Sequence, residues 1–190
     1  MTQVRNIALL TLFFAVAPAF GQEKTTSNSA NLQKPVSGTD RVRLGFLAGN
    51  FTTETYIPPS PSVPKGATGK GTSVITWALD SMFLFIEEQS TNSLFGEYTG
   101  HGVLGYDSQS HKFVLSMFNN SGDRPTYNGN FIGDTLVLGT KVPMPGRSFD
   151  QKLLWYKDGD AVRLKVLNDS GKGFLLVLEQ TAVPVRQETK

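Results

Sequence analysis

The sequence has 190 residues, with 18 lysine and arginine residues against 16 aspartate and glutamate residues, two histidines and no cysteine. The absence of cysteine excludes disulfides, thiolate metal sites and cysteine nucleophiles. The basic residues are dispersed, and a chain without a lysine and arginine cluster does not fit a nucleic-acid-binding protein. Nineteen glycines and thirteen phenylalanines are typical of a protein built from strands and turns.

The first 21 residues have the pattern of a secretory signal peptide (1–21). Arg5 is their only charged residue, an apolar run covers 7–16, and Ala19 and Gly21 place small residues just before a cleavage point at Gln22. The apolar run is shorter than the roughly 20 residues that a membrane-spanning helix needs. We therefore expect an exported protein, periplasmic or extracellular, with no transmembrane anchor in the mature chain.

Residues 22–41 are polar and carry few large apolar side chains, so we expect a flexible tether there. The next segment, 42–183, is long enough for one domain with its own core, and residues 184–190 form a short tail. Within the domain, apolar and polar residues alternate with period two between turn residues, which is typical of an antiparallel all-β barrel or sandwich. The expected strands are 49–57, 68–79, 82–90, 96–107, 112–119, 124–132, 134–140, 147–157, 160–167 and 172–181.

Alternation also predicts which way the side chains of a strand face. In the ninth expected strand, Val162, Leu164 and Val166 should be buried, with Arg163 and Lys165 in solvent, because the opposite assignment would bury two charges. In the fourth expected strand, 96–107, three glycines lie on the same face as two tyrosines and a leucine, and His101 lies on the opposite face. The residues of the shared face are Gly96, Tyr98, Gly100, Gly102, Leu104 and Tyr106. Glycines in that arrangement indicate either the sharp coiling of a closed barrel or space left in its interior.

Five segments carry a resemblance to a known family. They are Leu44-x-Phe46-Leu47-x-Gly49, Trp77-x-Leu79-Asp80-x-x-Phe83-Leu84, the run Gly100-His101-Gly102-Val103-Leu104-Gly105-Tyr106-Asp107, Gly133-Asp134-Thr135-Leu136, and Gly171-Lys172-Gly173-Phe174. Through them the chain resembles a bacterial family of exported, calycin-like barrels, the domain-of-unknown-function family number fifteen seventy-nine. The resemblance implies an antiparallel meander of about ten strands that closes into a calycin- or lipocalin-like barrel. It implies no catalytic residue and no cofactor.

Five large aromatic residues are the candidate lining of the barrel interior: Trp77, Phe83, Tyr98, Tyr106 and Trp155. A barrel of about eight to ten strands is only wide enough to hold either packed side chains or one small ligand. The aromatic residues therefore have two interpretations. They either contact a small apolar or amphipathic ligand or fill the core themselves.

Neither a metal site nor a catalytic site emerges from the titratable residues. His101 is expected to face outward and His111 to lie in a turn, so with Glu97 and Asp107 they do not form a convergent set of metal ligands. Glu87 and Glu88 are adjacent on an expected strand, so their carboxylates should face opposite ways and cannot act as a catalytic pair. No Gly-x-Ser-x-Gly motif is present.

We therefore expect a non-enzymatic carrier or binder of a small apolar or amphipathic ligand. The alternative is a structural or interaction protein of the cell envelope whose barrel is filled by side chains. A hydrolase-type enzyme ranks last, because no motif in the sequence supports one.

Overall fold

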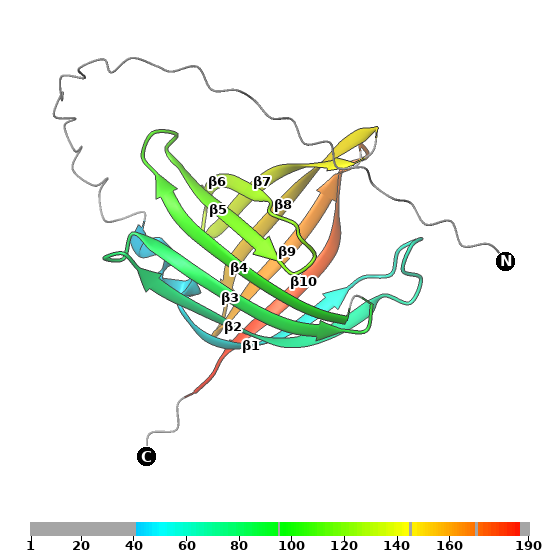
Figure 1. Ribbon diagram of the computed structural model, residues 1–190, viewed down its shortest axis with the longest axis horizontal. Coiled ribbons are helices and arrows are strands. Elements are labelled where there is room, and N and C mark those ends of the chain that lie inside the picture. Colours follow the sequence, from blue (N-terminus) through cyan, green and yellow to red (C-terminus); the bar gives the residue numbers. More distant parts are fainter. Residues whose placement is uncertain (1–40, 95, 145, 170, 187–190) are drawn as a thin grey trace, which may run out of the picture. The chain divides into compact units, whose positions relative to one another are not determined.

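The structure, a computed structural model, describes residues 41–186 except 95, 145 and 170. These residues form ten antiparallel strands around a closed barrel, preceded by a short 3₁₀ helix (Figure 1). The all-β meander of about ten strands expected from the sequence is confirmed. The elements are η1 (Arg43–Leu47), β1 (Gly49–Ile57), β2 (Ala67–Ala78), β3 (Phe83–Asn92), β4 (Gly96–Asp107), β5 (Lys112–Asn119), β6 (Thr126–Ile132), β7 (Thr135–Met144), β8 (Arg147–Asp158), β9 (Ala161–Asp169) and β10 (Phe174–Pro184).

The barrel closes through a pairing between its first and last strands. Each strand pairs with the next along the chain, and β1 pairs with β10 in a register that runs from Phe51–Pro184 to Tyr56–Glu179. A further backbone hydrogen bond joins Val185 N to Asn50 O at 2.8 Å. Closure leaves neither β1 nor β10 as a free edge, which is the part of a β-protein that is open to pairing with another chain.

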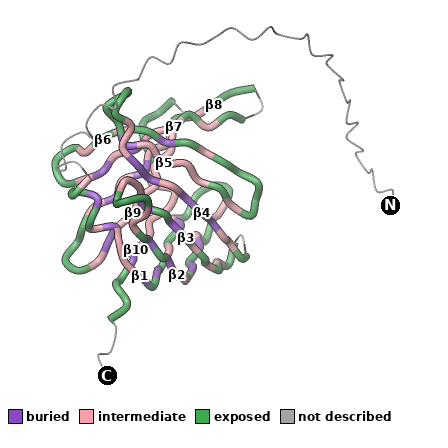
Figure 2. Tube along the Cα trace, turned by 60° about the vertical axis from the view of Figure 1, so that its left-hand side comes forward, coloured by how far each residue is buried: buried purple, intermediate pink, exposed green. Residues whose placement is uncertain are grey.

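Burial along the strands follows the expected period of two (Figure 2). In β3, Leu84 and Ile86 are 0% and 4% exposed, whereas Phe85 between them is 43% exposed. Successive side chains of a strand point to opposite faces, so every second residue faces the barrel interior. This alternation fixes which residues can line the interior.

The face assignment in β9 is confirmed. Val162 is buried, while Leu164 and Val166 are half-buried because they line the interior cavity described below. On the opposite face, Arg163 donates to Asp158 at 3.0 Å, and Lys165 Nζ lies 3.9 Å from a carboxylate oxygen of β10. Both cations keep contact with solvent, as the pattern predicts.

One end of the barrel, which we call the closed end, is covered by η1. Leu44 and Leu47 of this helix are each 1% exposed and belong to the main hydrophobic cluster. The same cluster contains fully buried leucines from the facing strands: Leu84, Leu104, Leu115, Leu136 and Leu138. Each such side chain contributes about 1.5–3 kcal/mol through removal of apolar surface from water. The other end, formed by the loops after β1, β3, β5, β7 and β9, is the mouth.

Strand β7 extends further than the sequence predicts. It continues to Met144 and includes Pro143, which pairs with Ser148 of β8. The register of β7 with β6 reaches only Gly139 opposite Asn128, so the extension has β8 as its partner and projects beyond β6 as an edge. Proline is tolerated at such an edge because it has no ladder hydrogen bond to donate there.

The remaining expectations on domain organisation concern the ends of the chain. The signal peptide (1–21) and all but the last residue of the tether (22–41) lie outside the described residues, as does the end of the tail. Within the described part of the chain, no helix is long and apolar enough to cross a membrane.

Candidate ligand-binding cavity

The interior of the barrel contains a cavity of about 410 Å³ that extends from η1 toward the mouth. Among the described residues, every strand except β7 contributes to its wall, and Leu47 of η1 forms part of its floor. Sites for small ligands typically measure about 300–1,000 Å³. The cavity therefore has the size of a small-molecule site, near the lower end of that range.

On the side of β3 and β5, the cavity wall changes from apolar to polar between the closed end and the mouth. The inward-facing residues of β3 show this change in order: Leu84 and Ile86 lie near η1, and Glu88, Ser90 and Asn92 follow toward the mouth. In β5, Leu115 and Met117 are followed in the same way by Asn119. On this side the cavity therefore has an apolar floor and a polar upper wall, whereas Ile57, Val166 and Leu178 keep the upper wall apolar on the side of β1, β9 and β10.

Glu88 is the buried acid of this cavity. Its Oε1 accepts a hydrogen bond from Nε2 of Gln180, which lies on β10. Strands β1 and β2 separate β3 from β10 in the barrel, so the contact reaches across the interior. Burial raises the pKa of Glu88, an effect that the hydrogen bond from Gln180 partly offsets. Glu88 is half-buried and lines the cavity.

Two tyrosines line the same cavity as this carboxyl. Burial, reinforced by the negative charge of Glu88, raises the pKa of Tyr98 to about 12. Burial and the charge of Asp123 raise the pKa of Tyr127, whose hydroxyl donates to Oε1 of Gln151 at 2.6 Å. Both phenols therefore stay neutral and act as hydrogen-bonding groups with apolar rings.

The glycines of β4 accommodate neighbouring side chains. A Cβ atom on Gly100 would lie 2.5 Å from the hydroxyl oxygen of Tyr98, and one on Gly102 would overlap the sulfur of Met117. The space that these two glycines release is therefore occupied by Tyr98 and Met117. Their absent side chains allow the two neighbours to lie flat against β4, which keeps the centre of the barrel open.

The structure separates the five aromatic residues expected to line the interior. Tyr98 and Trp155 line the cavity. Trp77 and Tyr106 pack against the hydrophobic cluster at the closed end, where the ring of Tyr106 meets Phe113 edge-on at 5.2 Å. The aromatic set therefore partly lines the cavity and partly fills the core.

For Phe83 the structure corrects the expectation. Phe83 alternates with Leu84, which takes the inward position, so Phe83 lies on the outer face opposite Gly105. A Cβ atom on Gly105 would overlap the ring of Phe83, which shows how closely the ring packs on this strand. The sequence places an aromatic residue at the start of β3, but its neighbour determines which face it occupies.

The polar residues that matter most for the cavity were not predicted as site residues. Glu88 was considered only as half of a pair with Glu87, whereas its inward position follows from the alternation of Leu84 and Ile86 on the same strand.

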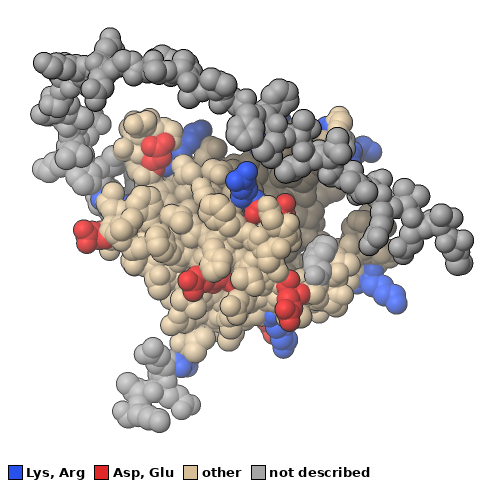
Figure 3. Space-filling model, viewed as in Figure 1, with Lys and Arg blue, Asp and Glu red and all other residues tan. Residues whose placement is uncertain are grey.

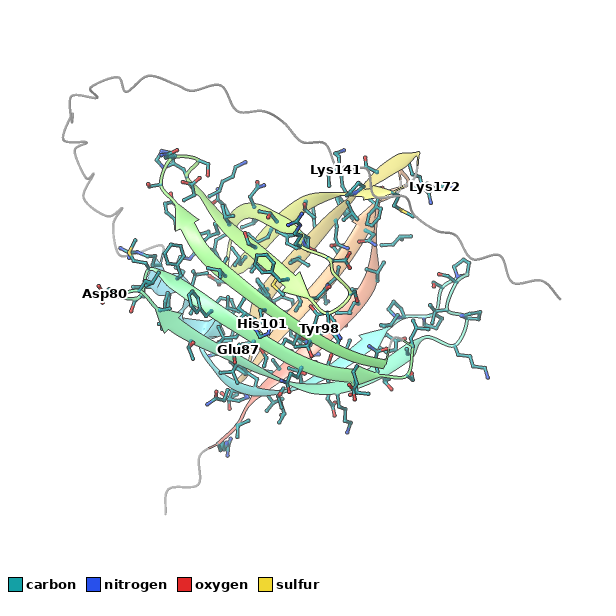
Figure 4. All side chains as sticks on the ribbon, in the orientation of Figure 1. Asp80, Glu87, Tyr98, His101, Lys141 and Lys172 are labelled. Carbon is teal, nitrogen blue, oxygen red and sulfur yellow. The ribbon has the colours of Figure 1, made fainter. Side chains whose placement is uncertain are left out.

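Figure 4 locates Glu87, Tyr98 and His101 on the adjacent strands β3 and β4. His101 is exposed, and the part of the chain that the structure describes contains no group of three His, Asp or Glu residues able to hold a metal ion.

Glu88→Gln should raise the thermal stability of the protein near neutral pH and change it little in acid. The pKa of Glu88 is raised in the folded protein from an ordinary value of 4.5. A raised carboxyl pKa stabilises the fold most below the unfolded pKa, and this contribution is lost as pH rises through the folded pKa. Glutamine does not titrate, and its amide oxygen can still accept the bond from Gln180. Melting temperatures at about pH 4 and about pH 8 test this; the same difference at both would contradict it.

No family model matches the chain, and no curated protein matches it. The resemblance to the exported calycin-like family is therefore supported only at the level of the closed barrel. The fold and the site together define a ten-stranded antiparallel β-barrel with a small internal cavity that is apolar at its floor and carries polar groups on one side toward its mouth.

Proposed function

We propose that the protein binds a small amphipathic ligand inside a calycin-like barrel and acts without catalysis. The observation that carries the proposal is the cavity of about 410 Å³, whose wall is apolar near η1 and has polar groups on β3 and β5 toward the mouth. Such a wall offers apolar burial to one part of a ligand and hydrogen bonds to the other. A barrel filled by side chains, the structural alternative, would lack this space.

The polar groups of the cavity favour binding over hydrolysis. Glu88 accepts a hydrogen bond from Gln180 and lies opposite Ser73 in the β2–β3 ladder, and no described histidine lines the cavity to act as the base of a serine nucleophile. The serines of the cavity wall among the described residues are Ser73, Ser90 and Ser121, and neither described histidine lines the cavity. The proposal that this barrel is a carrier is supported by the geometry of the cavity and not only by the analogy of its fold to ligand carriers.

Binding is tested with N-phenylnaphthylamine, an uncharged apolar fluorophore that brightens on leaving water. We expect saturable binding by the purified protein. Val166→Phe, which places an aromatic ring in the cavity, should weaken it roughly tenfold or more, a change of about 1.4 kcal/mol per tenfold. Val74→Phe makes the same change on the outer face of β2, where the residue is 36% exposed, and is the matched control. Equal binding by both variants would show that the dye binds elsewhere.

We also propose that the chain is exported and cleaved before Gln22. The support is the order of one charged residue, an apolar run and small residues within 1–21. The intact mass of protein recovered from outside the cytoplasm should equal that of residues 22–190. A mass equal to the uncleaved chain would refute the proposal.

A further inference from the structure

The charged residues of the cavity wall are of one sign. Glu88 and Asp123 line the cavity, and no lysine, arginine or histidine does so among the described residues. The four described cations that form ion pairs do not line the cavity: they are Lys70, Lys141, Arg163 and Lys165. On the face shown in Figure 3, acidic and basic residues are scattered among uncharged atoms. A single sign of charge is therefore a property of the interior and not of the surface.

Glu88 lines the cavity, and only one of its two carboxyl oxygens has a hydrogen-bond partner among the described residues. Its Oε1 accepts the hydrogen bond from Gln180, and its Oε2 has no partner among the described residues. A buried carboxylate is costly unless a cation or several donors compensate it. The raised pKa of Glu88 reflects this incomplete compensation. A ligand that supplies an N–H donor and a positive charge would complete the coordination of the carboxylate.

The neighbours of Glu88 also suit a cation. Tyr98 is close enough to Glu88 for the negative charge of Glu88 to raise the pKa of Tyr98. Tyr127 also lies close enough to Tyr98 to raise that pKa. The faces of aromatic rings attract ammonium groups, more strongly where water is excluded. A carboxylate or phosphate ligand would find no counter-ion here and would be repelled by Glu88.

We propose that the ligand is an amphipathic amine: a compact ammonium headgroup that pairs with Glu88 below the mouth, and an apolar chain or ring that extends toward η1. This proposal rests on the proposed function and specifies its ligand class. Leu47, Phe51 and Ile75 form the apolar end that receives the tail. Asp123 at the mouth adds a second negative charge on the entry path.

The test compares three ligands that share one chain and differ in headgroup: decylammonium, decanol and decanoate. The affinity of each ligand is measured by its displacement of bound N-phenylnaphthylamine from the mature protein. The measurements are made near neutral pH, with each ligand below its micelle concentration. We expect decylammonium to bind about tenfold or more tightly than decanoate, with decanol between them. Glu88→Gln should remove most of the advantage of decylammonium and leave decanol binding unchanged.

Glu87→Gln is the matched control. It makes the same chemical change one residue away, on the outer face of β3, where Glu87 is exposed and lies opposite His101. This variant should rank the three ligands as the wild-type protein does. Melting curves of both variants test whether they fold. The order in which the wild-type protein binds the three ligands tests the amine assignment even if one variant does not fold.

The outcomes separate the two proposals. If decanol or decanoate binds as tightly as decylammonium, the amine assignment is overturned while the binding function stands. An unchanged preference for decylammonium in Glu88→Gln would also overturn the role of Glu88. If none of the three displaces the probe, the proposed function fails, and the amine assignment fails with it.

Discussion

Replacing Trp155 with alanine should lower the free energy of unfolding by about 3–5 kcal/mol. Trp155 is 8% exposed and belongs to the hydrophobic cluster, and one side of it faces the cavity. Trp155 lies opposite Leu136 of β7 and Leu164 of β9 in the sheet, so its truncation leaves a gap within the packed core. Chemical denaturation monitored by circular dichroism measures the loss.

Phe118→Ala is the control for this substitution. Phe118 is 53% exposed on β5, and its truncation should change stability by about 0.5 kcal/mol or less. Trp155→Ala should also alter probe binding, because the indole is part of the cavity wall. A loss of stability no larger than that of Phe118→Ala would mean that Trp155 does not pack as the structure shows.

The second large effect is expected from the addition of a single methyl group. Gly129 of β6 lies opposite Leu138 of β7, and a Cβ atom on it would overlap the backbone oxygen of Val137. A backbone atom within a paired strand cannot rotate away as a side chain can. Gly129→Ala should therefore destabilise the protein by about 1–3 kcal/mol, toward the upper end of what overpacking costs.

Gly139→Ala offers a matched comparison on the neighbouring strand. A Cβ atom there would meet only Gln151 O, at 3.7 Å, which is ordinary contact. Because alanine restricts the unfolded chain more than glycine does, this variant should be neutral or more stable by about 0.4–1 kcal/mol. Unfolding curves of the two variants should thus shift in opposite directions, and shifts of the same sign and size would refute the close approach at Gly129.

The sequence predicted the strands well because local chemistry determines them. Turn residues such as Gly133-Asp134 and Asp158-Gly159 separate the strands, and period-two alternation orients them, so the ten strands follow in the expected order. The length of β7 was underestimated because a proline at 143 argues against a strand unless the strand is known to be an edge. Edge positions depend on how far the neighbouring strand reaches, and the sequence of β7 does not contain that information.

The candidate site was harder to predict because it depends on relations between distant strands. Tyr98 and Trp155 were recognised by their size, but size alone did not separate them from Phe83, which faces outward. The contact between Glu88 and Gln180 joins residues 92 positions apart in the sequence. An alternation pattern can show that each faces inward, but only the order of strands around the barrel shows that they meet.

The pairing of β1 with β10 has a consequence for the order in which the chain folds. During synthesis β1 emerges first, yet its partner on one side is the last strand of the domain. Hairpins from β2 to β9 can form as they appear, because each joins strands adjacent in the chain. The edge of β1 that β10 later covers stays unpaired until then, and an unpaired edge can associate with other chains. A chain interrupted before Phe174 would retain that edge permanently, so a nascent or truncated form is the one that needs protection from aggregation.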